Sequence, residues 1–224
     1  MSEEDNYYVS KRSEFFAQFE DFVQRIVGLM NHKYGENDEI IVDEIKEEYS
    51  RLYKEIPFIG GDSNPLTFNL VSAVGHLAVY KVLKRHGKPL NQIGELSYGA
   101  EEELFSNNPQ LIPPMTHPKY VYYMKMAAKK SEEKKYPGDW VYKFIEGKGF
   151  DYGLDFIECG IHKFFNEHDA SEFTPYLCAM DRIISENGNL GLHRTETLVE
   201  GSDRCNFRYK GGRKTQILNT VIKD

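Results

Sequence analysis

The three cysteines of this sequence all lie between residues 159 and 205, and none occurs earlier in the chain. A thiol becomes a nucleophile when it loses its proton, which requires a nearby base or surroundings that lower its pKa. A single cysteine is more often a small buried residue. The clustering of Cys159, Cys178 and Cys205 therefore indicates that residues 150–208 are the part of the chain most suited to chemistry.

A helix predicted to begin at Thr174-Pro175 and to end near Gly188 brings two candidates together. Cys178 and Asp181 are three residues apart and therefore share one face of this helix. The first turn, where we expect Cys178, lowers the pKa of a thiol. Asp181 is suited to accept a proton or to orient the thiol. We predict both residues as catalytic.

A second candidate pair stands at the end of a strand predicted over residues 150–158. Cys159 lies between this strand and a helix predicted over residues 160–166, a common position for a reactive thiol. Glu158 is a candidate acid or base, and we predict both residues as catalytic. His162 lies one helical turn beyond Cys159 and would complete a Cys–His pair, but a histidine that simply faces solvent is favoured over such a pair.

A hairpin is predicted near the C-terminus, with strands over residues 192–199 and 204–209. With Val199 opposite Arg204, the polar face carries Thr195, Thr197, Asn206 and Arg208. The other face carries Leu192, Leu198, Cys205, Phe207 and Tyr209, with Arg194 and Glu196 among them. A half-buried hairpin with a polar outer face gives a similar pattern, and a one-residue slip would reverse the faces.

Arg194 is the residue of this hairpin that packing alone explains least well. A buried arginine requires a carboxylate or an anionic ligand. We predict that the hairpin binds substrate through Arg194, Thr195, Thr197, Cys205 and Arg208.

The loop over residues 57–65 is rich in glycine and proline and precedes a predicted helix. Asn64 is suited to cap this helix, and Pro65 suits its first position. Gly60 and Gly61 can present backbone N–H groups to an anion, but no lysine follows them, so a plain connecting loop is favoured. We predict that Asn64 contributes to substrate binding.

Helical periodicity dominates the first part of the chain. It predicts helices over residues 10–33, 43–56, 65–86, 90–106 and 119–135. A hairpin over residues 140–145 and 150–158 follows. The predicted fold class is α+β, with a helical N-terminal half packed on a C-terminal antiparallel sheet built from hairpins with intervening helices. We expect one domain over residues 1–224: helical to 135, mixed to 210, and a tail that adds a short strand or remains irregular.

Composition excludes several classes of partner. The net charge of −7 argues against nucleic-acid binding, because such binding relies on neutralising phosphates. No apolar run is long enough to cross a membrane, and the acidic N-terminus does not resemble a signal peptide, so we expect a cytoplasmic protein. The expected partner is a small-molecule substrate, and homo-oligomerisation stays open. Because neither C-x-x-C nor H-E-x-x-H occurs, we expect no metal and no other cofactor.

The order and spacing of several blocks resemble the L-2-amino-thiazoline-4-carboxylic acid hydrolase family. The blocks are residues 63–69, 158–163, 175–181 and 194–198, followed by Gly201 and residues 205–208. Two departures are visible: the family often has Asp where this chain has Asn206, and His162 stands at a variable position. The second departure counts against a Cys159–His162 pair as a device of the family.

The resemblance implies a hydrolase that opens a small heterocycle bearing a carboxylate, at a C–N or C–S bond of a cyclic amidine or amide. Such chemistry needs a nucleophile, a proton donor and a cation for the carboxylate. The alternative is a non-enzymatic module that binds a small hydrophobic acid. This alternative is favoured by the 15 Tyr and 14 Phe residues and by the lack of a complete catalytic triad in the sequence.

Overall fold

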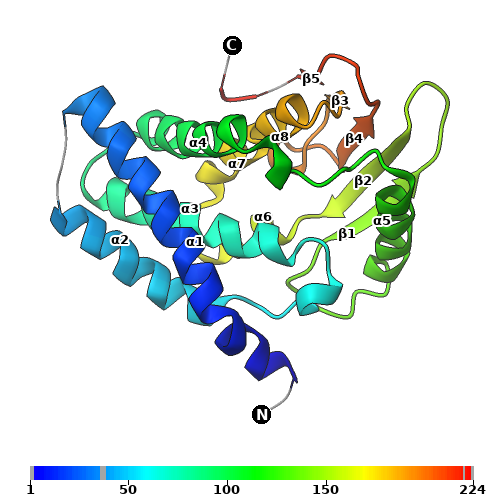
Figure 1. Cartoon of the computed structure of the whole chain (residues 1–224). Helices are drawn as coiled ribbons and strands as arrows, with labels where there is room; N and C mark the ends of the chain where they lie inside the picture. Colours follow the sequence, from blue (N-terminus) through cyan, green and yellow to red (C-terminus); the bar gives the residue numbers. More distant parts are fainter. Residues whose placement is uncertain (1–2, 36–38, 219, 223–224) are drawn as a thin grey trace. The chain divides into compact units, whose positions relative to one another are not determined.

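The computed structural model describes residues 3–35, 39–218 and 220–222. Contacts between Cα atoms divide the chain into two compact units, Met1–Glu103 and Leu104–Asp224. The first unit is helical and the second combines helices with a mostly antiparallel sheet, so the predicted α+β class is confirmed (Figure 1). The expectation of one domain stays a prediction.

The first unit contains four helices of the described chain. They are α1 Glu3–Tyr34, α2 Glu39–Leu52, α3 Thr67–Arg85 and α4 Leu90–Asn107, of which the last extends past the end of the unit. Two short 3₁₀ turns, η1 Tyr53–Glu55 and η2 Gly61–Ser63, lie between α2 and α3.

Apolar side chains at helical spacing hold this unit together. On α1 the buried residues include Phe15, Phe19, Phe22 and Ile26, which lie three or four positions apart and form one stripe. The Phe19 ring stacks on Tyr49 of α2 with centroids 3.8 Å apart. Helix α3 is buried on nearly every side, as its uniformly apolar sequence predicts.

Helix α3 begins at Thr67, two residues later than predicted. The side chain of Asn64 does not cap the helix itself. Its Oδ1 accepts a hydrogen bond from the Leu66 N–H at 2.9 Å, while its Nδ2 donates to the Ile59 carbonyl at 2.6 Å. Asn64 therefore closes the loop that precedes the helix.

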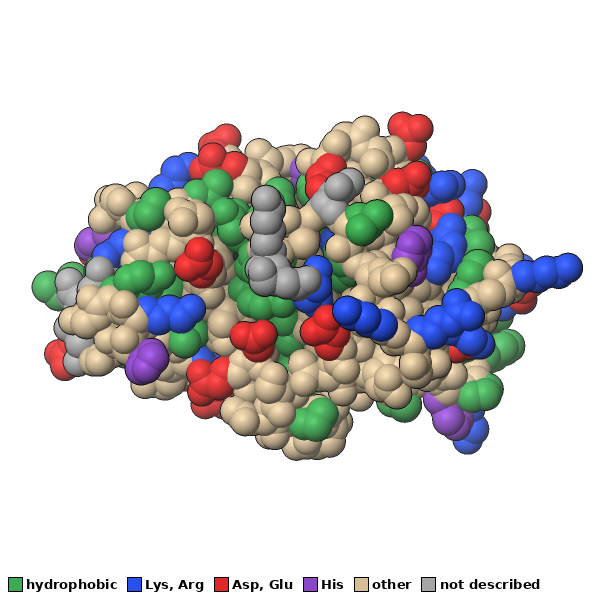
Figure 2. All heavy atoms as spheres, turned by 90° about the horizontal axis from the view of Figure 1, so that it is seen from above, with side chains coloured by type: hydrophobic (Ala, Val, Ile, Leu, Met, Phe, Trp, Pro, Cys, Tyr) green, Lys and Arg blue, Asp and Glu red, His purple; other side chains and the backbone are tan. Residues whose placement is uncertain are grey.

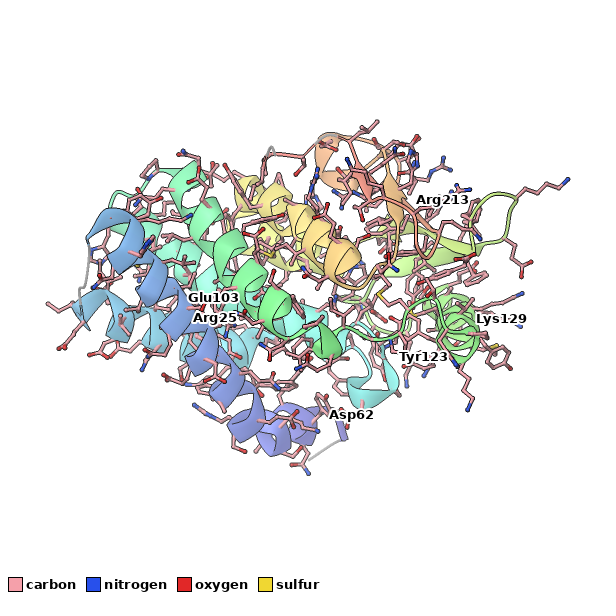
Figure 3. The ribbon with its side chains drawn as sticks, turned by 45° about the horizontal axis from the view of Figure 1, so that its top comes forward. Arg25, Asp62, Glu103, Tyr123, Lys129 and Arg213 are labelled. Atoms are coloured by element: carbon pink, nitrogen blue, oxygen red, sulfur yellow. The ribbon has the colours of Figure 1, made fainter. Side chains whose placement is uncertain are left out.

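The same loop is tied to the start of the chain. Asp62, labelled in Figure 3, accepts a hydrogen bond from the Tyr7 hydroxyl at 2.8 Å. Gly61 has a positive φ of 57°, and a Cβ added there would lie 2.8 Å from the Tyr7 ring. A glycine is thus required both by the backbone conformation and by the close approach of Tyr7.

The second unit supplies the sheet and the shorter helices. Its helices are α5 Pro118–Ser131, α6 Gly160–Glu167, α7 Thr174–Ala179 and α8 Asp181–Asn187, and its 3₁₀ turns are η3 Pro109–Leu111, η4 Ser171–Phe173 and η5 Leu198–Glu200. Its strands are β1 Val141–Ile145, β2 Tyr152–Glu158, β3 Leu192–Arg194, β4 Cys205–Tyr209 and β5 Gln216–Ile217. The strand order is β1-β2-β4-β3-β5.

The first predicted hairpin is confirmed, because β1 and β2 pair antiparallel. Strand β4 pairs antiparallel with β2 on its other side, so residues distant in sequence become neighbours: Asp155 lies opposite Asn206, and Phe156 lies opposite Cys205. The tail does add a short strand, β5, but this strand runs parallel to β3. The sheet is therefore antiparallel except at this last pair.

The second predicted hairpin is only partly correct. Strand β3 ends at Arg194, and the chain then forms η5 in place of the expected strand to Val199. His193 pairs with Arg208, a register that differs by two residues from the predicted one. A two-residue difference preserves the side-chain parity, so within β3 and β4 Arg194 stays on the face of Phe207 and Tyr209. The predicted faces are wrong beyond Arg194, where Thr197 is buried and Glu196 pairs with Arg204.

Aromatic side chains line one face of the sheet. The residues on this apolar face include Tyr142, Phe144, Tyr152, Leu154, Phe156, Phe207 and Tyr209. Helix α5 contacts the edge strand β1. Tyr123 and Lys129 project from α5 in Figure 3, and Tyr123 is exposed. The sheet therefore presents an apolar face and a polar face, and the site residues must be assigned to one or the other.

Within the described residues, no helix is both long enough and apolar enough to pass through a membrane. Charged side chains of both signs occur on the face shown in Figure 2. This mixture agrees with a chain that carries 28 basic and 35 acidic side chains.

Candidate functional site

A partly buried ion pair joins Arg194 at the end of β3 to Asp181 at the start of α8. Arg194 is only 1% exposed, and its Nη1 also donates to the Cys178 carbonyl at 2.9 Å. The guanidinium lies 5.5 Å from the centre of the Phe207 ring. The sequence therefore correctly predicted that Arg194 is buried and needs a carboxylate. Within the described chain its Nε has no hydrogen-bond partner.

Asp181 is the accessible member of this pair. Its side chain is 35% exposed, although protein surrounds it closely enough that burial raises the pKa of the carboxyl. The charge of Arg194 opposes this shift without cancelling it. A carboxyl group with a raised pKa that water can still reach is a candidate for proton transfer.

All three thiols lie close enough to Asp181 to be affected by its charge. Burial is the main cause that raises the pKa of Cys159, Cys178 and Cys205, and the negative charge of Asp181 raises each of them further. The three cysteines thus converge on one buried cluster, as their spacing in the sequence suggested. All of these residues belong to the second unit.

Cys159 has the most favourable surroundings of the three. It is the N-cap residue of α6, although its side chain forms no capping hydrogen bond. Burial raises the pKa of its thiol, but the backbone N–H groups of Ile161 and His162 and the side chain of Trp140 favour the thiolate. Among the described residues, several donors approach the sulfur of Cys159, one approaches that of Cys205, and none is found at Cys178. We therefore rank it first among the candidate nucleophiles.

Trp140 approaches Cys159 because the next residue is a glycine. A Cβ added at Gly160 would lie 2.7 Å from the Trp140 ring and 2.7 Å from the Gly138 carbonyl oxygen. Sequence reasoning missed this role for Trp140. The available signal was that it is the single tryptophan of the chain and that it precedes the first hairpin.

Replacing Gly160 with Ala is expected to destabilise the protein by about 1–3 kcal/mol, because the added methyl group would overlap the Trp140 ring and a backbone oxygen. Chemical denaturation followed by circular dichroism measures the change. Gly201→Ala provides a comparison for packing, because nothing lies within 4 Å of a Cβ added there, and its cost is confined to the strain of a positive φ of 86°. A Gly160→Ala protein as stable as the wild type would contradict the predicted overlap.

The prediction for Cys178 was wrong in one respect. The expected helix from Thr174 to Gly188 is divided at Met180 into α7 and α8, so Cys178 lies near the C-terminal end of a six-residue helix. Its thiol therefore gains nothing from a helix N-terminus, and burial raises its pKa well above the ordinary value. The proximity of Cys178 to Asp181 is nevertheless as predicted.

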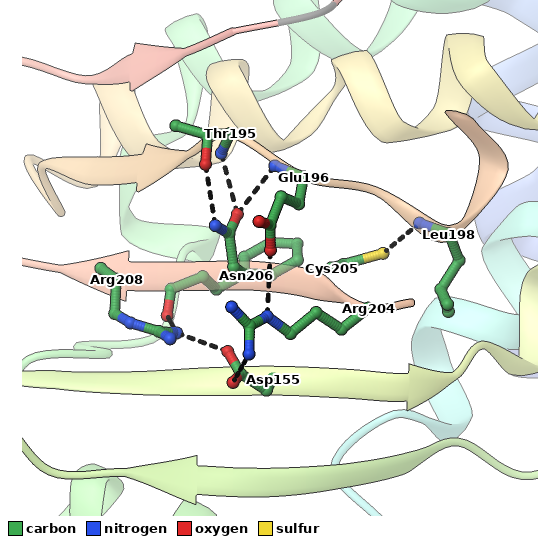
Figure 4. Close-up of polar contacts among 9 residues, drawn as sticks. Asp155, Thr195, Glu196, Leu198, Arg204, Cys205, Asn206 and Arg208 are labelled. Carbon is green, nitrogen blue, oxygen red and sulfur yellow. Dashed lines mark hydrogen bonds and ion pairs between the residues drawn. The ribbon is translucent and has the colours of Figure 1, made fainter. Parts of the chain in front are cut away.

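Cys205 has a structural environment. Its Sγ accepts a hydrogen bond from the Leu198 N–H at 3.2 Å, and so it holds the start of η5 against β4 (Figure 4). Burial raises the pKa of this thiol to about 12. Substrate binding by Cys205 stays a prediction, but the sulfur already has a role in the fold.

Because thiolates react and thiols do not, the raised pKa values predict slow alkylation. At pH 7.5 we expect each cysteine to react with iodoacetamide at least about tenfold more slowly than free cysteine, whose pKa is about 8.5. The rates should increase as the pH rises, and Cys205, whose pKa is about 12, should still react slowly at pH 9. Peptide mass spectrometry after timed quenching measures each rate. A thiol that reacts as fast as free cysteine at pH 7.5 would contradict the expected pKa shifts.

Glu158 lies in a different electrostatic environment. Its carboxylate is held by Lys134 and Lys163, each at 2.5 Å. These two hydrogen-bonded cations hold the pKa of Glu158 below its usual range. An acid with a lowered pKa remains ionised at neutral pH, so Glu158 is poorly suited to donate a proton. Its catalytic role stays a prediction without support from its surroundings.

Replacing Glu158 with Gln is expected to reduce any hydrolytic activity by less than about threefold, because the carboxylate is occupied by two lysines. The same replacement should lower the free energy of unfolding by about 1 kcal/mol or less, because the two ion pairs of Glu158 are partly exposed. The lowered pKa means that this contribution is present at neutral pH and is lost as the pH falls through the folded-state pKa. Steady-state kinetics and denaturation at pH 7 and pH 4 test both points. A loss of activity of 100-fold or more would restore Glu158 as a catalytic candidate.

The polar face of the sheet holds a separate network (Figure 4). Asp155 on β2 pairs with Arg208 at 2.7 Å and with Arg204 at 3.4 Å. The side chain of Asn206 accepts hydrogen bonds from the backbone N–H groups of Thr195 and Glu196 and donates to the Thr195 hydroxyl. Thr195 and Arg208 are therefore engaged on the face of the sheet opposite to Arg194.

The network gives Asn206 a role that an aspartate could fill only in part. Asn206 uses its amide N–H group to reach the Thr195 hydroxyl oxygen, and it accepts two backbone hydrogen bonds through its carbonyl oxygen. An aspartate can form the second kind of contact, but it lacks the N–H donor. The asparagine thus pairs with both the backbone N–H groups and the threonine hydroxyl of this bend.

Two further predicted binding residues have local roles in the fold. Thr197 is buried, and its hydroxyl donates to Glu200 at 2.7 Å within the bend around η5. Asn64 belongs to the first unit, where it shapes the loop before α3. Substrate binding by Thr197 and Asn64 stays a prediction.

Tyr209 and Tyr152 are cluster members that sequence reasoning missed. Their rings stack with centroids 4.9 Å apart, and burial raises the pKa of both phenols. The charges of Asp181 and Arg194 both act on Tyr209, which places its ring close to the ion pair. The Tyr152 hydroxyl is buried, and no partner for it occurs among the described residues. Their alternation with Leu154 and Phe207 was visible in the sequence, but it is typical of any apolar sheet face.

Among residues 3–35, 39–218 and 220–222, no group of three or more His, Cys, Asp or Glu side chains is arranged to hold a metal ion. The three thiols and the carboxylate of Asp181 are therefore not arranged as the ligands of a metal ion.

The structure is that of an α+β protein whose sheet-containing unit carries a partly buried Asp–Arg pair beside its cysteines. The chain belongs to the L-2-amino-thiazoline-4-carboxylic acid hydrolase family, whose model matches residues 72–209, more than half of the sequence. The match includes Cys159, Cys178, Asp181 and Arg194 but begins after the block at residues 63–69. A search of curated proteins gave no match.

Proposed function

We propose that this protein hydrolyses a C–S or C–N bond in a small heterocycle that bears a carboxylate, in the manner that its family's name suggests. The observation that carries the proposal is the Asp181–Arg194 ion pair, which joins a buried arginine to a partly exposed carboxylate beside the thiols of Cys159 and Cys178, within the matched residues. In the thiazoline carboxylate of the family name, the reactive carbon lies between the ring sulfur and a nitrogen.

Asp181 is assigned the role of acid and base. Attack on the ring carbon requires the removal of one proton from the nucleophile, and departure of the ring sulfur or nitrogen requires the return of one proton. A single carboxyl group with a raised pKa can perform both transfers in sequence. Arg194 fixes the position of Asp181 through their ion pair and anchors the end of α7 through the Cys178 carbonyl.

Cys159 is assigned the role of nucleophile. Its proton passes to Asp181 as the sulfur attacks the ring carbon, and the protonated Asp181 then gives that proton to the departing ring atom. Water next attacks the resulting covalent adduct, loses a proton to Asp181 and releases the Cys159 thiol. The net reaction adds one water to the substrate. Cys178 is the alternative nucleophile, and direct attack by water activated by Asp181 is the route without a thiol.

The binding of the substrate carboxylate requires a cation. Arg194 and Arg208 were both predicted for this task. Arg208 is engaged by Asp155, whereas the Nε–H of Arg194 lacks a partner among the described residues. We assign the carboxylate to Arg194 in preference to Arg208, provided that side chains move to open this edge of the guanidinium.

The test is an assay of purified protein with 2-amino-thiazoline-4-carboxylate. Cleavage of the C–S bond releases a free thiol, which a chromogenic disulfide detects, whereas cleavage of the ring C–N bond releases a free amine. We expect one of these products to accumulate and Arg208→Lys to retain most of the rate. The absence of turnover on this compound and on related cyclic amidines and amides would refute the proposal.

The second candidate is a non-enzymatic module that binds a small hydrophobic acid. It is favoured by the raised pKa of every thiol and by the stacked Tyr152 and Tyr209 rings beside the ion pair. A binding module should bind the thiazoline carboxylate or a similar acid saturably without product formation. Calorimetry combined with product analysis on the same sample separates the two functions.

A further inference from the structure

Helix α5 has an apolar stripe on the side that faces away from the sheet. Its buried residues Met124, Ala128 and Ser131 lie on the side that contacts β1. Tyr122 and Met126 lie one helical turn apart on the opposite side, where their side chains are 67% and 48% exposed. These two side chains do not hold α5 to the sheet, so they are available to a partner.

Lysines border this stripe on both sides. Lys125 pairs with Glu146 at 2.6 Å. The other three, Lys119, Lys129 and Lys130, are exposed, and the structure shows no ion pair for them within the residues that it describes. Lys129 points outward from α5 in Figure 3. The outward face of α5 is therefore apolar at its centre and basic at its edges, and three of its lysines lack a counter-charge in the described chain.

Helix α2 of the first unit carries the opposite charge on its outward face. Glu39, Asp43 and Glu47 are exposed and follow one another at intervals of four residues, so they form one row along the helix. No ion pair to these three carboxylates occurs in the described part of the chain. Like charges at this spacing repel one another, and a partner of opposite charge relieves the repulsion. Ile40 lies beside the row and is 69% exposed, so α2 also presents an apolar side chain there.

The outward faces of α5 and α2 match in chemistry. Each combines exposed apolar side chains with charges that have no ion-pair partner among the described residues, and these charges are of opposite sign. The first unit as a whole has more acidic than basic side chains, whereas the second has nearly equal numbers. We propose that the outward face of α5 binds the outward face of α2 on a second copy of this chain. The second copy is the partner whose complementary face the sequence itself supplies.

The proposed contact is small, and it is therefore expected to be weak. Each of the two helices has 14 residues, which correspond to a length of about 21 Å. Two such faces bury less area than the roughly 800 Å² per partner of a stable complex. We expect a dissociation constant on the order of 1–100 μM at low ionic strength. Because the contact joins two different faces, association continues until the copies close into a ring or form an open chain.

The first test is sedimentation velocity on the full chain, which measures the mass in solution. In about 50 mM salt the average mass should increase with protein concentration through the micromolar range. In about 1 M salt the screening length falls to about 3 Å, so the dissociation constant should increase at least about tenfold. A protein that keeps the mass of a single chain at every concentration in low salt would overturn the proposal.

Charge reversals identify the two faces. Lys129→Glu with Lys130→Glu makes the face of α5 acidic. Asp43→Lys with Glu47→Lys makes the face of α2 basic. Each double variant alone should associate at least about 100-fold more weakly than the wild type, because like charges then face one another. An equimolar mixture of the two variants should associate again, because the acidic α5 of one meets the basic α2 of the other.

The matched control is Lys148→Glu with Lys214→Glu, which changes the net charge by the same amount as the α5 variant at two exposed lysines outside α5. It should associate within about threefold of the wild type, as expected for surface substitutions outside the contact. Circular dichroism verifies that each variant is folded. Association that survives either charge reversal, or a mixture that stays monomeric, would overturn the pairing of α5 with α2.

Discussion

Replacing Asp181 with Asn is expected to lower kcat for ring opening by at least about 100-fold, the usual contribution of a positioned acid or base. The amide has nearly the same shape but cannot take the proton from the nucleophile or return it to the leaving atom. The asparagine amide does not titrate, whereas the native carboxyl does, with a pKa that burial raises. Steady-state kinetics with the thiazoline carboxylate measure the change.

The control for this variant is Asp151→Asn, which removes a carboxylate engaged with Lys210 and the Gly211 N–H. It should keep kcat within about twofold of the wild type, because these contacts lie outside the cluster. The folding of Asp181→Asn must be verified, since Arg194 would lose its charged partner. A folded Asp181→Asn enzyme with full activity would remove Asp181 from the mechanism.

A second large effect is expected at Cys159. Replacement with Ser should lower kcat by at least about 1,000-fold, because a hydroxyl is a much weaker nucleophile when only one acid–base group assists it. The substitution nearly preserves the side-chain volume, so α6 and Trp140 should keep their positions. Kinetics of the variant and mass spectrometry of the quenched wild-type reaction measure the effect, and the wild type should show an adduct on the Cys159 peptide.

The other two cysteines distinguish a nucleophile from a structural thiol. Cys205→Ser should lose less than about tenfold in kcat, because serine can also accept the hydrogen bond from the Leu198 N–H. Cys178→Ser tests the alternative nucleophile directly. If Cys178→Ser loses activity while Cys159→Ser keeps it, the two roles are exchanged. If both variants remain active, water activated by Asp181 is the nucleophile.

Much of the fold followed from local patterns in the sequence. The apolar stripe of α1, the uniformly apolar α3 and the alternation in the first hairpin are local signals, and each predicted its element correctly. Element ends were less accurate, as at Asn64, where a side chain closes a loop instead of capping a helix. The break at Met180 and the early end of β3 were not predicted, and the contact of Arg194 with the Cys178 carbonyl beside them is a tertiary one that periodicity does not contain.

The candidate site was also predicted only in part, because only some of its residues have a local signal in the sequence. Arg194 was identifiable because a charged residue interrupts an apolar face, and Cys178 with Asp181 because they are close in sequence. The roles of Trp140 and Tyr209 could not be predicted, since they depend on Gly160 admitting the indole and on β4 lying beside β2. Arg208 was predicted as a ligand-binding residue because it lies on the polar face of the hairpin. Its partner Asp155 lies 53 residues earlier, and no local pattern links the two.

The most direct test of the central claim is the mass of the product formed when the wild-type protein acts on 2-amino-thiazoline-4-carboxylate. If the Asp181–Arg194 cluster supports hydrolysis, the substrate should be converted with catalytic turnover into a species one water heavier, and Asp181→Asn should not form it at a comparable rate. Saturable binding of the compound without any such product would contradict the account.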